Sequence, residues 1–463
     1  MSRRPHVRRG LLAVLALVST ALALAAPSAS AQLKSDNVQL LGKVPDSVGA
    51  IGARFSPDGR TMYVTGATGL QIYDVTLPAV PRKLSQVALP HLENEDVDVG
   101  DGVVVISNDP SFTSVGALYL IDVSNPSRPY LRSTLTTYVP LVGTNNSDNG
   151  HIANCVQGCD YLYTTGTTDG LTVYDLRDLD NPRYVKAMPM PAGGGFTHDV
   201  HIDAAGIAWV TGEDGAFGFD VTDPLNPVLR YRSDETITNT GGGLPGQDGS
   251  GPLDFLHHNM LRTSINVSDT GRISQAKIPG TGNVLAVTEE DYAKPTCEGQ
   301  GSLQTWRITG ERNSDGSIKL ELLDLWTTEL NELAEQTGRS PATVNCSAHW
   351  FDEHGGLIAQ GWYDQGVRFI DASQPRDLKQ VGYWTTTGTF WAAYYAPTEP
   401  AREIVYALDI TSGIDVLRID RPNATRERRK PVKESELGAS NQPSGTPHET
   451  FGFACPLPAT AVL

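Results

Sequence analysis

The sequence predicts an all-β protein built from a repeated unit of four strands. Of the 463 residues, 46 are Gly and 30 are Pro, a composition that favours turns and short strands over long helices. One phrase also recurs along the chain: an apolar strand that ends in Asp and leads into a turn that usually contains Pro. Clear copies begin at Gly69, Ala117, Gly170, Gly215 and Gly366, and degenerate copies begin at Ser302 and Gly413.

Each copy follows the same order of elements. An alternating apolar strand leads to a turn, a second strand, a loop, the phrase strand, the Pro turn and a last strand. Four short antiparallel strands per copy are typical of one blade of a β-propeller. The seven copies therefore predict a seven-bladed β-propeller over residues 32–423.

The recurring Asp is interpreted as a structural residue. An Asp at the end of a strand can accept hydrogen bonds from the amides of the following turn, and Pro then stops strand pairing. The five copies of this residue are Asp74, Asp122, Asp175, Asp220 and Asp371.

The N-terminal end of the repeat region supplies a strand that its C-terminal end lacks. The segment 37–44 matches the last strand of other copies, whereas the copy that begins at Gly413 lacks one. We therefore expect the N-terminal strand to complete the last blade and close the ring. Residues 424–463 are charged and contain Pro and Ser, and they are predicted to form a mobile tail.

The phrases resemble the LVIVD repeat, a β-propeller repeat of exported bacterial proteins. The resemblance rests on the seven imperfect copies and implies the propeller fold. It implies no activity, because propellers host many functions.

The N-terminus predicts export. Residues 1–31 combine four Arg residues, an apolar stretch from Leu11 to Ala26 and a small-residue cleavage site at Ala29–Ala31. An ordinary secretory signal and a twin-arginine signal, the latter suggested by Arg8 and Arg9, both stay open. The mature protein is expected to be secreted, monomeric and free of a membrane anchor.

The five cysteines suit an oxidising compartment. Local spacing predicts the pairs Cys155–Cys159 and Cys297–Cys346 and leaves Cys455 over. The net charge of −17 argues against a nucleic acid or an anionic membrane as partner, because those partners need clustered Lys and Arg.

Most of the additional loop length, and five histidines, are expected on one face of the ring. His151, His198, His257, His258 and His349 lie at or near the starts of the first strands of four successive blades. Imidazole suits copper, iron or zinc, so His151, His198, His258 and His349 are candidate ligands of one transition metal. Nearby acids, Asp214, Glu289 and Glu290, are candidate outer partners that orient the rings. A hydrogen-bonded polar lining without metal is the alternative, and calcium at Asp96 and Asp98 is a weaker one.

Two functions follow from this organisation. The first is a secreted scaffold that binds a protein, peptide, glycan or small molecule through its loop-rich face, since long clustered loops often carry binding. The alternative is an extracytoplasmic metal-dependent oxidoreductase with the multi-histidine site at the channel mouth. The sequence favours the scaffold slightly, because that function needs only loops on a rigid frame.

Overall fold

The computed structural model describes residues 33–89, 96–108, 117–135, 150–166, 170–191, 196–237, 251–291, 296–339, 344–398 and 403–421. The predicted leader 1–31, the tail 424–463 and Cys455 lie outside these residues. The described chain is all-β apart from one helix, α1 (Glu329–Thr337), so the predicted class is confirmed.

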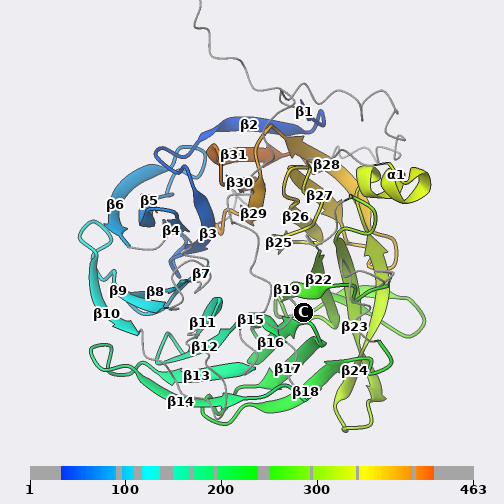
Figure 1. Ribbon diagram of the computed structural model, residues 1–463, viewed down its shortest axis with the longest axis horizontal. Helices are drawn as coiled ribbons and strands as arrows, with labels where there is room; N and C mark the ends of the chain where they lie inside the picture. The colour runs from blue at the N-terminus through cyan, green and yellow to red at the C-terminus, as the bar shows by residue number, and fades with distance from the viewer. Residues whose placement is uncertain are drawn as a thin grey trace, which may run out of the picture.

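Sheets stand side by side around a common centre, and the first strand of each repeat copy lies innermost (Figure 1). Three of them contain four antiparallel strands in chain order. These strands are β3 (Ala50–Phe55), β4 (Thr61–Gly66), β5 (Gly69–Asp74) and β6 (Arg82–Ala88); β7 (Asp96–Val99), β8 (Val103–Asn108), β9 (Ala117–Asp122) and β10 (Tyr130–Leu135); and β11 (Ile152–Val156), β12 (Tyr161–Thr165), β13 (Leu171–Asp175) and β14 (Arg183–Met188).

The next two four-strand units share an edge and form one eight-stranded sheet. The strands are β15 (Thr197–Ile202), β16 (Ile207–Gly212), β17 (Gly215–Asp220) and β18 (Val228–Ser233), followed by β19 (Leu256–Arg262), β22 (Val284–Glu290), β23 (Ser302–Arg312) and β24 (Ile318–Trp326). A separate hairpin, β20 (Ile265–Val267) and β21 (Ile273–Gln275), lies between β19 and β22 in the chain.

The shared edge departs from the expected separate units. In this copy Arg307 stands where the clear copies have the turn Asp, and it pairs with Asp269 and Glu321 at 2.7 and 2.8 Å. The strand continues past Arg307, and β23 is 11 residues long. The lengthened β24 then pairs in parallel with β18 of the preceding unit.

The last two sheets contain the N-terminal strands as well as C-terminal ones. The first consists of β25 (Phe351–His354), β26 (Leu357–Gly361), β27 (Val367–Asp371) and β28 (Lys379–Thr385), with β1 (Leu33–Lys34) at its edge. The second consists of β29 (Phe390–Tyr395), β30 (Ile404–Asp409) and β31 (Gly413–Ile419), with β2 (Val38–Lys43) antiparallel to β31.

The structural role of the recurring Asp is confirmed. In all five clear copies its Oδ1 accepts a hydrogen bond from the amide two residues ahead, at 2.9–3.2 Å. This bond fixes the turn that separates the third strand from the fourth.

A second recurring contact links neighbouring sheets. A side chain of one sheet donates a hydrogen bond to the carbonyl of the turn Pro in the next, as Ser85 does to Pro126 and Tyr163 to Pro224. Tyr406, in the last sheet, donates to Pro78 of the first at 3.0 Å. The first and last sheets are thus in direct contact.

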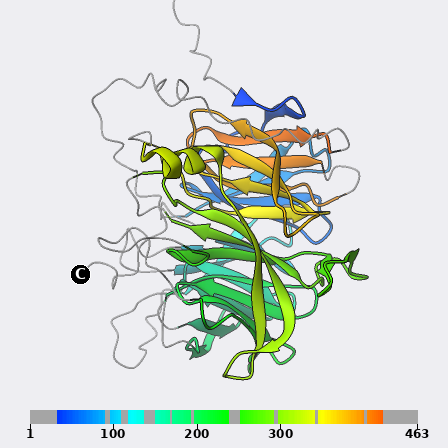
Figure 2. The ribbon, with the colours of Figure 1, turned by 90° about the vertical axis from the view of Figure 1, so that its right-hand side faces the viewer.

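The described connections between strands include one helix and two disulfides. Thr328 caps α1 by accepting from the Asn331 amide, and α1 lies on one face of the ring (Figure 2). The two predicted cysteine pairs are confirmed, with Cα separations of 4.5 Å for Cys155–Cys159 and 5.2 Å for Cys297–Cys346. Among the described residues, no helix is long and apolar enough to cross a membrane.

Candidate metal centre

Four histidines meet near the centre of the ring. His151 directly precedes β11, His198 is in β15, His258 is in β19, and His349 lies two residues before β25. Because these innermost strands run in the same direction around the centre, residues near their starts gather at one end of it. All four side chains are buried, with residue exposures of 0–1%.

The four imidazoles are in contact as a chain. The ring centroids of His151 and His198 are 4.6 Å apart, those of His198 and His258 4.2 Å, and those of His258 and His349 4.0 Å. The Nε2 atoms of His258 and His349 are 2.9 Å apart. We call these four residues the histidine cluster.

Two of these histidines lie where the strand is irregular. The pairing of β15 shifts between Thr197 and Val200, and that of β19 shifts between His257 and Met260. A β-bulge re-aims the side chains next to it, and bulges are common beside functional sites. The bulges therefore help to place His198 and His258 in the same cluster.

Hydrogen bonds fix which ring nitrogens of the cluster carry hydrogen. His198 Nδ1 donates to the His258 carbonyl at 2.9 Å, and His349 Nδ1 donates to the Trp391 carbonyl at 2.7 Å. His258 Nδ1 faces Asn259 Oδ1 at 3.3 Å. Since a backbone carbonyl oxygen can only accept, the Nε2 atoms of neutral His198 and His349 keep their lone pairs.

The environment keeps the rings neutral. Burial lowers the pKa of His349 to about 3 and holds those of His198 and His258 well below the ordinary value. Repulsion between neighbouring imidazolium charges lowers them further. Neutral imidazole is the form that binds a metal ion.

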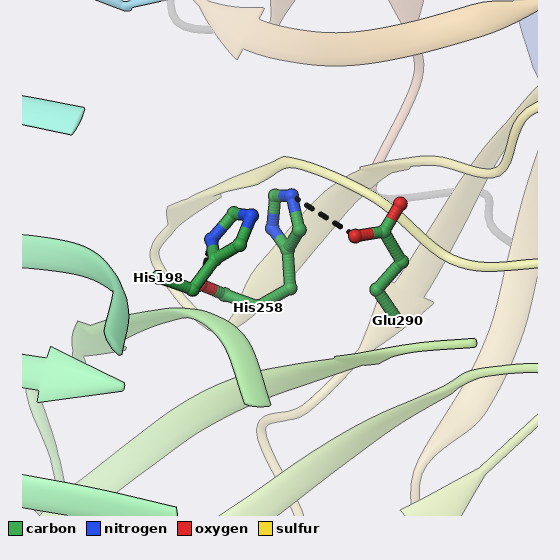
Figure 3. A group of neighbouring side chains, drawn as sticks. All are labelled: His198, His258 and Glu290. Carbon is green, nitrogen blue, oxygen red and sulfur yellow. Dashed lines mark hydrogen bonds and ion pairs between the residues drawn. The ribbon is translucent and has the colours of Figure 1, made fainter. Parts of the chain in front are cut away.

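Glu290, the last residue of β22, lies against the cluster (Figure 3). Its Oε2 is 3.8 Å from His258 Nε2, and its Oε1 is 3.9 Å from His349 Nε2. One potential ligand atom from each of His198, His258 and Glu290 lies within 4.8 Å of the others. Glu290, expected as an outer partner, is therefore close enough to be a ligand itself.

The other two acids are placed differently. Glu289 points to the other side of β22, where it accepts from the amides of Asp254 and Phe255 and lies 3.6 Å from His257 Nε2. Asp214 is half-buried in the turn between β16 and β17. Neither acid is joined to the histidine cluster by a described contact.

The sequence did not single out Tyr363 as part of the site. Tyr363 donates its hydroxyl to Glu290 Oε1, and its ring centroid is 5.1 Å from that of His349. Its φ is 28°, a backbone conformation that non-glycine residues rarely adopt and that recurs at functional sites. Tyr363 lies two residues beyond the end of β26, so the strand pattern of the repeat gave no signal for it.

Trp391, the second residue of β29, also borders the cluster. Its ring centroid is 4.4 Å from that of His349, and its carbonyl accepts from that imidazole. Trp391 thus holds His349 in both position and tautomer.

A second polar group lies further along the same innermost strands. Asp96 and Asp98 of β7 accept from the amides of Ala153 and Cys155, and Asp98 pairs with Arg54 at 3.4 Å. Burial raises the pKa of Asp96 to about 6, although Arg54 partly opposes this rise. With an arginine already among these acids, calcium is not favoured there.

The comparisons with known proteins concern the fold. No family model matches the sequence, and no curated protein does. A solved β-propeller domain, that of Cps50 (Swd1) from Myceliophteria thermophila, is similar with a TM-score of 0.51. The two chains share 11% sequence identity, and the matched region covers 83% of this chain and 100% of the Cps50 domain. The fold is a β-propeller.

Another solved structure, the periplasmic gluconolactonase PpgL of Pseudomonas aeruginosa, is similar with a TM-score of 0.47. The two chains share 13% sequence identity, and the matched region covers 73% of this chain and 86% of the gluconolactonase chain.

Proposed function

We propose that this propeller is an exported, metal-dependent oxidoreductase with one transition metal held by His151, His198, His258 and His349. Glu290 lies beside the metal as a further ligand or as a base. The observation that carries this proposal is the convergence of potential ligand atoms of His198, His258 and Glu290, which lie within 4.8 Å of one another. The Nε2 atoms of His258 and His349 are also 2.9 Å apart, a contact that a proton on one ring satisfies in the metal-free protein and that a cation bound by both rings would replace.

The spacing of these two nitrogens suits a bound metal. With metal–nitrogen bonds of about 2.0–2.1 Å, two imidazole nitrogens at a right angle, as in a tetragonal copper site, would be about 2.9 Å apart, whereas tetrahedral zinc would hold them about 3.3 Å apart. The hydrogen bonds from His198 and His349 to backbone carbonyls are the outer contacts that usually orient metal-binding imidazoles.

The set of donors fits copper, iron or zinc. Several imidazoles with one carboxylate suit these three metals, whereas calcium and magnesium prefer oxygen ligands. Copper and iron change oxidation state easily, and a buried site shields such chemistry from bulk water. Oxidation–reduction is the class of reaction that copper or iron at this site would support.

Metal analysis tests the proposal. Protein purified without an affinity tag should carry about one equivalent of copper, iron or zinc. His198→Ala and His349→Ala should lose the metal and stay folded. His354→Ala is the matched control: His354 ends β25 and contacts Tyr395 rather than the cluster. Less than about a tenth of an equivalent, even after reloading, would overturn the proposal.

We also propose that the ring has seven blades of the LVIVD type and that β2 closes it. The pairing of Val38–Lys43 with Gly413–Ile419 supports closure, as does the bond from Tyr406 to Pro78. The two disulfides agree with an exported protein, and export itself rests on the sequence of residues 1–31.

The interaction scaffold receives no specific support. Much of the long loops on which it rests, including residues 136–149 and 238–250, lies outside the described residues. The metal site now has more geometric support, because its residues are described and in contact.

A further inference from the structure

A small cavity adjoins the histidine cluster. Its volume of about 10 Å³ is close to the room that one water molecule needs. His349 forms one part of its wall, and Asp96 and Tyr394 provide polar groups. Trp350 and Trp391 provide two aromatic walls. The cavity therefore lies between the cluster and the second polar group.

The cavity lies on the side of the centre where the innermost strands carry no histidine. The cluster comes from the first strands β11, β15 and β19 and from the segment before β25. The remaining first strands, β3, β7 and β29, carry no histidine, and all three line the cavity. Ile152, the residue after His151, also lines it, and His349 is the member of the histidine cluster in its wall.

We propose that this cavity holds the exchangeable ligand of the metal centre, a water molecule or an anion of the same size, with Asp96 as its charged neighbour. The inference rests on the metal-dependent function proposed above. A metal that reacts with an external molecule needs one position that the protein does not fill. The cavity offers such a position next to His349.

The walls restrict what can enter. A space for one water, bounded by two indoles and Ile51, excludes ligands of more than a few atoms unless side chains move. Water, hydroxide and fluoride satisfy this limit. Azide, with three atoms in a row, should bind more weakly than fluoride.

Asp96 should control which charge the ligand can have. Four titratable or charged groups surround it: Arg54 on β3, Asp98 on β7, Asp199 on β15 and Tyr394 on β29. Burial raises the pKa of Asp96 to about 6, so it is neutral at pH 5 and negative at pH 8. An anion in the cavity is repelled by the negative form, and it should bind more tightly as the pH falls through 6.

Fluoride binding to the copper(II)-loaded full-length protein tests this inference. Electron paramagnetic resonance would show an added splitting from the fluorine nucleus when fluoride binds the metal. At pH 8, Asp96→Asn should raise the fluoride affinity at least tenfold, because it removes a negative charge next to the ligand. The same substitution should abolish the pH dependence between 5 and 8.

Asp98→Asn is the matched control. Asp98 lies two residues further along β7, about 7 Å from Asp96 along the strand, and it pairs with Arg54 instead of lining the cavity. It should change the fluoride affinity less than about threefold. Absence of the fluorine splitting in copper-loaded protein, or equal effects of both substitutions, would overturn the inference. Failure to bind copper at all would instead overturn the proposed function.

Discussion

Replacing Tyr363 by Phe isolates the contribution of one hydroxyl to the candidate metal centre. The substitution removes the hydrogen bond to Glu290 and keeps the ring, so packing against His349 and Trp391 is preserved. The backbone at φ 28° is held separately, because the amides of Gly366 and Phe390 donate to the Tyr363 carbonyl at 3.2 and 2.9 Å. The change is therefore local.

The expected effect follows from the buried acceptor that the substitution leaves without its donor. Leaving a buried polar atom unsatisfied costs about 1–3 kcal/mol, so the free energy of unfolding should fall by about that amount. Loss of a contact that orients a metal ligand typically lowers metal affinity about 10–100-fold. The visible spectrum of the copper-loaded variant should also shift, because Glu290 would no longer be held in place.

Tyr395→Phe is the control. Tyr395 is also a buried tyrosine, but within the described part of the chain its hydroxyl has no hydrogen-bond partner. Removing that hydroxyl should leave stability unchanged or slightly higher, with no effect on the metal. Chemical denaturation and metal competition measure both quantities. Equal losses in the two variants, or unchanged metal affinity in Tyr363→Phe, would refute this account of Glu290.

Three further predictions concern the fold and its pH dependence. Deleting residues 32–45 removes the partner of β31 and should lower the melting temperature strongly, whereas an unchanged value would contradict ring closure. Asp371→Ala removes the acceptor for the Ser373 amide and should cost about 0.5–1.5 kcal/mol in denaturant unfolding, an effect that an Asn substitution should largely avoid. His349 has a pKa of about 3 in the fold and about 6.5 when unfolded. The unfolded chain therefore binds more protons between these values, so the metal-free protein should lose stability as the pH falls from 6.5 towards 3. His349→Gln should reduce that loss, and an identical pH profile would refute it.

The repeat explains why so much of the fold could be predicted. Each copy repeats the same local rules, in which Asp ends the third strand and a Pro-bearing turn follows, and these rules act over a few residues. One departure is in the copy that begins at Ser302, where β23 is 11 residues long and β24 pairs with β18 of the preceding unit.

The site was predicted only in outline, for a physical reason. The histidine positions at strand starts indicated a common location, but whether neighbouring residues face the centre depends on local irregularities of pairing. Bulges beside His198 and His258 depend on the partner strand and leave no pattern in the sequence. Glu289 and Glu290 are adjacent and chemically alike, yet they point to opposite sides of β22. Tyr363 acquires its role from an uncommon backbone conformation.

X-ray absorption spectroscopy of the metal-loaded protein tests the central claim most directly, because it counts the atoms around the metal and detects imidazole rings. The account predicts nitrogen or oxygen neighbours at about 2.0–2.1 Å, with outer scattering from at least three imidazoles. That outer scattering should weaken in His198→Ala and stay unchanged in His354→Ala. A metal surrounded by oxygen or sulfur without imidazole scattering would contradict the claim that the histidine cluster is a metal centre.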